Sequence, residues 1–112
     1  MERQIVTALI TAILLSLPGA AYSDETDADS VAHGRELVSV NCAPCHSIEE
    51  TGPSPHPDAP PFRTLSRKYP VSLLEEALAE GIMTGHEDMP VFVAEPEQIT
   101  DIVAFLESIQ EQ

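Results

Sequence analysis

Apolar residues recur at helical spacing in three stretches of the chain, at residues 31–40, 72–81 and 96–110. The first stretch places Val31, Gly34, Leu37 and Val38 on one face. In the second, the apolar face comprises Leu73, Leu74, Ala77 and Leu78, and in the third it comprises Ile99, Ile102, Val103, Leu106 and Ile109. No strand signal is stronger than the short "VFV" at residues 91–93. The pattern predicts an all-α domain with three main helices.

The expected helix ends follow from residues that cap helices. Asp29 or Ser30 is a suitable cap for the first helix. Ser72, with Glu75 three residues later, matches the capping-box pattern, and Gly81 suits the end of that helix in a left-handed conformation. Pro96 occupies a plausible first position of the last helix.

The segments between these helices are long. Residues 51–61, "TGPSPHPDAPP", contain five prolines, which excludes both a helix and a central strand. A second interruption, "MTGHEDMPVFVA", separates the last two helices. Loops of roughly ten to fifteen residues are uncommon in so small a domain. They indicate that something is packed inside them.

The first residues resemble an export signal more than part of the domain. Arg3 precedes an apolar run from Ile5 to Leu17, and Pro18-Gly19 interrupts the run before a set of small residues. The run is shorter than the roughly 20 residues of a membrane span, although an uncleaved anchor is the alternative. We expect a signal peptide at 1–23, with cleavage after Ala21 as a second possibility, and therefore a periplasmic protein. A flexible acidic leader at 24–30 and a domain at 31–112 would follow.

Composition narrows the range of partners. The net charge of −14 disfavours nucleic acid and anionic lipid, and it favours docking on a basic patch of another protein. The acidity is equally compatible with a role in solubility alone.

The chain has no tryptophan and three phenylalanines, so its core is thin for a domain of this size. A large apolar cofactor would supply the missing core.

The sequence "NCAPCHS", residues 41–47, contains both cysteines of the chain. A structural zinc site would need a second close pair of ligands, which the sequence lacks. A dithiol redox pair would normally follow a strand in an α/β pattern, which is also missing. Cys-x-x-Cys-His is the attachment signature of c-type haem. It predicts one covalent haem c on Cys42 and Cys45, with His46 as the proximal iron ligand.

The second axial ligand is expected from the segment after the second helix. Met89, followed by Pro90 in "GHEDMP", is the preferred candidate because an irregular backbone can point its thioether inward. His86 on the same segment is the rival. Met83 is more typical of a core residue. His33 and His56 have no partner motif and are expected on the surface.

With these residues placed, residues 24–112 resemble a small class I bacterial cytochrome c. The resemblance rests on "GRELVSVNCAPCHS", "GHEDMPVF" and "ITDIVAFLESI". It implies a class I fold with long loops packed around the haem, in which Gly34 of the first helix meets Phe105 of the last. It also implies a proline carbonyl that accepts a hydrogen bond from His46. Pro53, Pro60 and Pro61 compete for this role, with the Pro60-Pro61 pair preferred.

Iron with both axial positions filled has no open site for substrate, so we expect an electron carrier rather than an enzyme. The chain would act as a monomer between redox partner proteins, or as a subunit of a periplasmic dehydrogenase complex. A ligand-binding sensor or peroxidase is the remaining alternative, if the methionine dissociates.

Overall fold

The computed structural model describes residue 19 and residues 23–81 and 88–111. Within these ranges the chain forms helices and irregular segments and contains no strand. The described residues form three α-helices, α1 (Ser23–Asn41), α2 (Leu74–Glu80) and α3 (Pro96–Ser108). They also form two short 3₁₀ helices, η1 (Phe62–Arg67) and η2 (Val71–Leu73), which both lie between α1 and α2. The all-α prediction is confirmed. No helix in the described ranges combines the length and the apolar character that a membrane crossing requires.

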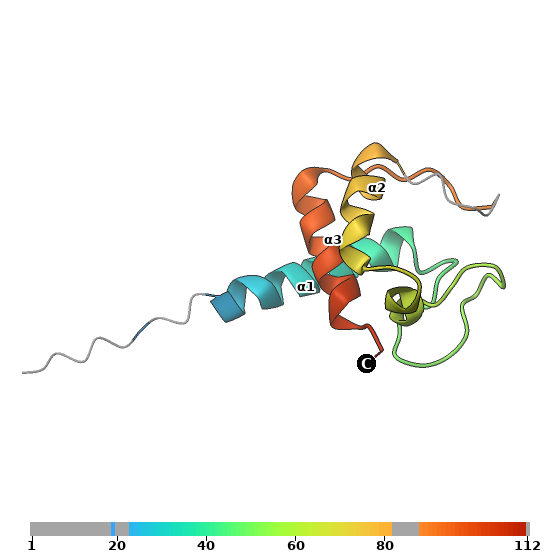
Figure 1. The fold of residues 1–112 in the computed structure, drawn as a ribbon, viewed down its shortest axis with the longest axis horizontal. Helices are drawn as coiled ribbons and strands as arrows, with labels where there is room; N and C mark the ends of the chain where they lie inside the picture. Colours follow the sequence, from blue (N-terminus) through green and yellow to red (C-terminus); the bar gives the residue numbers. More distant parts are fainter. Residues whose placement is uncertain (1–18, 20–22, 82–87, 112) are drawn as a thin grey trace, which may run out of the picture.

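Helix α1 is longer than the sequence pattern predicted. It begins at Ser23 and not near Ser30, so the segment expected to be a flexible leader is helical. This end of the helix projects away from the other elements (Figure 1).

The start of α2 also differs from the prediction. Pro70 has an extended backbone, and the 3₁₀ turn begins directly after it, so Ser72 lies inside that turn. The residue before α2 is Leu73, and it makes no side-chain cap. The capping box expected at Ser72 is therefore wrong. Gly81 does end the helix with a positive φ of 88°, as expected for a glycine at this position.

The last helix begins as predicted, with Pro96 in its first turn. Its cap is a capping box that the sequence analysis did not identify. The Glu95 side chain accepts a bond from the backbone of Gln98, and the Gln98 side chain accepts the Glu95 backbone N–H at 3.0 Å. The box fixes where the helix starts.

Helices α1 and α3 cross at close range (Figure 1). A Cβ atom built on Gly34 would overlap the Asp101 carbonyl and lie 2.9 Å from the Phe105 Cβ, so only glycine fits there. Val38 and Phe105 are almost completely buried beside this crossing. The predicted pairing of Gly34 with Phe105 is confirmed.

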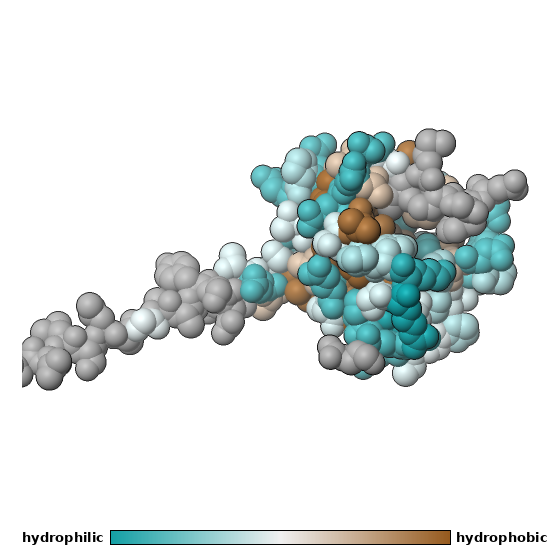
Figure 2. Space-filling view, viewed as in Figure 1, coloured by the Kyte–Doolittle hydropathy of each residue, from teal (hydrophilic) through white to brown (hydrophobic). Residues whose placement is uncertain are grey.

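One core cluster joins the three helices, and α2 packs against α3. The visible face of the body is mostly hydrophilic, with small hydrophobic areas (Figure 2). Among the residues that the structure describes, the exposed large apolar side chains are Val40, Leu73, Val91 and Val93.

Candidate cofactor site

A cavity of about 680 Å³ lies between the end of α1, the proline-rich loop, α2, α3 and the segment after residue 88. This volume is in the range of about 300–1,000 Å³ that small-molecule and cofactor sites occupy. Much of its wall is apolar, and this part includes Phe62, Leu65, Leu74, Leu78, Ile102 and Leu106. The two long loops therefore border a hollow, as their length predicted.

Both cysteines line this cavity. Backbone bonds hold them in a tight turn at the end of α1, where the Cys42 carbonyl accepts the N–H of Cys45 at 3.1 Å and that of His46 at 2.9 Å. The thiols are free and half-buried. Burial, followed by the neighbouring Cys45, raises the pKa of the Cys42 thiol to about 11. A redox-active cysteine usually has a lowered pKa, so this environment disfavours disulfide exchange.

His46 is buried on one wall of the cavity, and its ring is held from two sides. Nδ1 lies 2.8 Å from the Pro60 carbonyl oxygen, which can only accept, so Nδ1 carries the proton. The ring also stacks on Phe62, with 4.4 Å between the ring centroids. The buried Nε2 atom then carries the lone pair that a metal would need.

Pro60 is thus the proline whose carbonyl accepts the bond from His46, out of the three candidates. The proline-rich loop returns to the motif nearby, where the Phe62 N–H donates to the Ser47 carbonyl at 2.9 Å. Phe62 was not expected to support His46, because nothing in the sequence indicates which aromatic ring the histidine meets.

Met89 is half-buried and lines the same cavity as Cys42, Cys45 and His46. It also packs against the core cluster. Two of its rivals, Met83 and His86, lie outside the described residues. His33 is not among the residues that line the cavity, and it pairs with Asp101 at 2.5 Å.

His56 differs from its prediction as an exposed loop residue without a partner. It is half-buried, lines the cavity, and lies 3.0 Å from an Asp88 carboxylate oxygen through Nε2. Pairing between residues so distant in the sequence depends on the path of the proline-rich loop. No local motif could have indicated it.

Comparison with known protein families agrees with the geometry of this site. The model of the family described as "Cytochrome c" matches residues 31–110. The chain belongs to the cytochrome c family. Membership supports haem c as the cofactor and electron transport as the general function.

The chain is also similar to a "Cytochrome bc1 complex cytochrome c subunit" from Corynebacterium diphtheriae. The two are 31% identical over 102 residues, which cover 86% of this chain and 33% of that protein. The chain therefore spans about a third of the length of this relative. No solved structure matches the chain.

The residues of the cavity fit a c-type haem. They provide two thiols for covalent attachment, the buried imidazole of His46 with a fixed tautomer, the thioether of Met89 and an apolar wall. In the described part of the chain, no group of three or more His, Cys, Asp or Glu residues is placed to bind a metal ion by itself.

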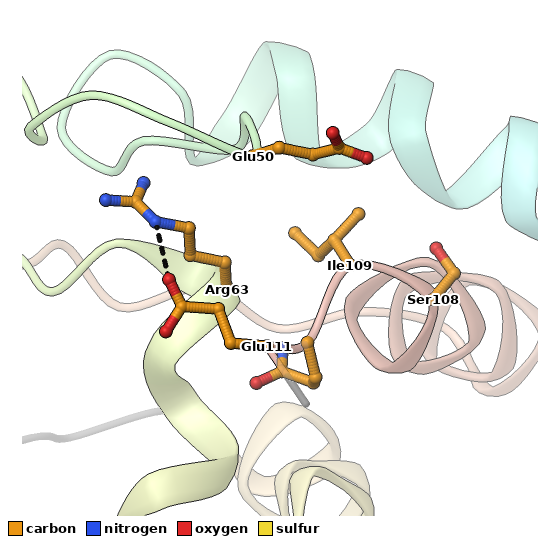
Figure 3. Close-up of a pocket in the computed structure, with 6 residues that line it drawn as sticks. Glu50, Arg63, Ser108, Ile109 and Glu111 are labelled. Atoms are coloured by element: carbon orange, nitrogen blue, oxygen red, sulfur yellow. Dashed lines mark hydrogen bonds and ion pairs between the residues drawn. The ribbon is translucent and has the colours of Figure 1, made fainter.

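A second hollow, of about 220 Å³, lies at the carboxyl-terminal end of α3 and has a different character (Figure 3). Arg63 donates to Glu111 at 3.2 Å and to the Gly52 carbonyl at 2.8 Å. Arg67 forms a further ion pair with Glu111. The polar groups of this hollow tie η1, the proline-rich loop and the chain end together, and the hollow offers no thiol or imidazole among its lining residues.

Proposed function

We propose that the protein is a periplasmic electron carrier with one haem c attached to Cys42 and Cys45, and with His46 and Met89 as the axial ligands of the iron. The observation that supports this most is the convergence of both thiols, the buried imidazole and the Met89 thioether on one apolar cavity. When bound, the haem iron supplies a one-electron couple, and methionine ligation favours its reduced state.

The chain's own residues would hold this centre still. The Pro60 carbonyl and the Phe62 ring fix the orientation of His46. The apolar wall excludes water and presents a low dielectric, which favours the state with less net charge. A rigid site needs little rearrangement between oxidation states, which suits electron transfer.

The net charge of the protein indicates the kind of surface on which it would dock. A protein with a net charge of −14 would be steered to a basic patch on its redox partner, and this attraction would weaken with added salt. Export through a signal peptide at 1–23 places the carrier in the periplasm. In this proposal, cleavage of that segment releases the carrier into the periplasm.

The test is a reduced-minus-oxidised spectrum of the protein exported in a host with the haem maturation machinery. We expect a low-spin c-type spectrum with haem that stays bound after denaturation. The far-red methionine-to-iron band of the ferric protein should be lost only slowly in excess cyanide, and the spectrum of the reduced protein should not change in excess carbon monoxide. Absence of covalent haem would refute the proposal, and rapid loss of the band would favour a ligand-binding sensor or peroxidase.

A cytochrome subunit of a larger enzyme is the second candidate. The relative in Corynebacterium diphtheriae is named as a subunit of the bc1 complex, and it is about three times as long as the matched region. A periplasmic dehydrogenase complex is another possible assembly. Co-purification of the chain with a larger enzyme would favour a subunit, whereas a soluble monomer that reduces and oxidises freely would favour the carrier.

A further inference from the structure

His56 is fixed to the cysteine motif on one side of the cavity. Its backbone N–H donates to the Cys45 carbonyl at 3.0 Å, and its own carbonyl accepts the Ala59 N–H at 3.2 Å. The Asp58 backbone N–H donates to its Nδ1 at 3.1 Å. Because Nδ1 accepts this bond, the proton lies on Nε2. These bonds orient the His56 ring independently of its contact with the segment after α2.

The protonated Nε2 donates to Asp88 at 3.0 Å, and Asp88 directly precedes Met89. The two partners are separated by 32 positions in the sequence, so the bond joins the proline-rich loop to the segment after α2. The Asp88 side chain is 72% exposed and that of His56 is 25% exposed, so the bond lies near the surface. His56, Asp88, Cys45 and Met89 all line the same cavity.

The segment that starts at Asp88 has no helix or strand up to Ala94. At its far end, the Ala94 N–H donates to the Leu78 carbonyl at 3.3 Å. Val91 and Val93 between these points are exposed. The His56 bond thus fastens the segment immediately beside Met89, at the position where a small displacement would move the thioether most.

We propose that the His56–Asp88 hydrogen bond positions Met89, by fastening its segment to the loop that follows the cysteine motif. This inference rests on the proposed function, because it takes Met89 as the axial ligand. His56 is a positioning residue that acts through Asp88 and has no bond to the iron in this proposal. The free energy of such a bond corresponds to about a two- to tenfold change in an equilibrium. Its loss should raise by that factor the fraction of molecules whose Met89 is displaced.

The experiment measures cyanide binding to the ferric, haem-loaded protein at one fixed pH, together with the far-red methionine-to-iron band. In His56→Ala, cyanide should bind about two- to tenfold faster than in the wild type, and the band should weaken. His56→Gln, whose amide can still donate to Asp88, should recover part of the difference. The double variant His56→Ala/Asp88→Ala should be no faster than either single variant.

The matched control is His33→Ala. It removes a second histidine–aspartate pair, which joins α1 to α3 outside the cavity, so the cyanide rate and the band should not change. The proposal is overturned if His56→Ala matches the wild type, or if the effects of His56→Ala and Asp88→Ala add. If the wild type nevertheless shows the far-red band and Met89→Ala loses it, the proposed function still stands. A wild-type protein without the band would refute the Met89 assignment and, with it, the role of His56.

Discussion

The crossing of α1 and α3 and the segment that carries Met89 are built in opposite ways. At the crossing, two regular helices meet through Gly34 and Phe105, and a single added carbon has no room. The segment after Asp88 is irregular, exposes Val91 and Val93, and is fastened at individual hydrogen bonds. The two regions therefore have different roles. The crossing supports the stability of the fold, and the segment determines how firmly the second ligand is held.

The largest effect is expected at the crossing. Gly34→Ala should lower the free energy of unfolding by about 2–3 kcal/mol, because the new Cβ overlaps the Asp101 carbonyl and the helices must separate. The far-red band of the folded fraction should not change. Chemical denaturation followed by helical circular dichroism gives the stability.

The reverse substitution on the same helix serves as the control. Ala32 is exposed, so Ala32→Gly should cost only about 1 kcal/mol through helix propensity. Propensity alone would make Gly34→Ala stabilising. A gain in stability for Gly34→Ala would therefore contradict the close crossing.

An intermediate effect is expected at Gly81, where the stability change should be smaller and the spectral change larger. Gly81→Ala strains a backbone with φ of 88° and places a Cβ 3.3 Å from both Val91 and Val93. We expect a loss of about 1–2 kcal/mol and a weaker far-red band, because the segment beside Met89 must shift.

Gly52 separates these two causes. It also has a positive φ, of 92°, but a Cβ there would meet nothing within 4 Å. Gly52→Ala should therefore lose stability through backbone strain and keep the band. Equal spectral changes in both variants would show that the valine contacts at Gly81 do not matter for Met89.

The smallest effect is a pH dependence at the crossing. The hydrogen bond from His33, supported by one from Ser30, holds the pKa of Asp101 below its usual value of 3.8 despite partial burial. A lowered folded-state pKa means that the stabilisation is present above about pH 4 and is lost as the pH falls through the folded value. The stability difference between the wild type and Asp101→Asn should be about 1 kcal/mol or less at pH 6. It should shrink below pH 4, and a difference that stays constant down to pH 2.5 would contradict this linkage.

The sequence predicted the parts of the molecule that depend on local pattern or on steric necessity. The Cys42–His46 motif, Pro96 and the proline-rich loop belong to this group, whereas the close contact at Gly34 was expected from the resemblance to the cytochrome c family. Pro60 was one of three possible acceptors, because the loop path that selects it is not encoded in any short motif. The predicted start of α1 and the predicted cap of α2 were wrong. Both regions contain several residues that could cap a helix, so the sequence did not show that α1 already begins at Ser23 or that the turn before α2 begins directly after Pro70.

The candidate site shows the same limit. Each prospective ligand could be named from residue type, but the supports could not be. Phe62 and His56 acquire their roles only when the proline-rich loop folds back on the cavity. Such contacts depend on tertiary structure, so a single sequence gives no spacing rule for them.

The central claim is that His46 and Met89 hold the iron of a haem attached to Cys42 and Cys45. Reduced-minus-oxidised spectra of haem-loaded wild type, Met89→Ala and His86→Ala test it most directly. We predict that Met89→Ala loses the far-red band while His86→Ala retains both the band and the low-spin spectrum. If Met89→Ala keeps the wild-type spectrum and His86→Ala loses it, the ligand assignment is contradicted.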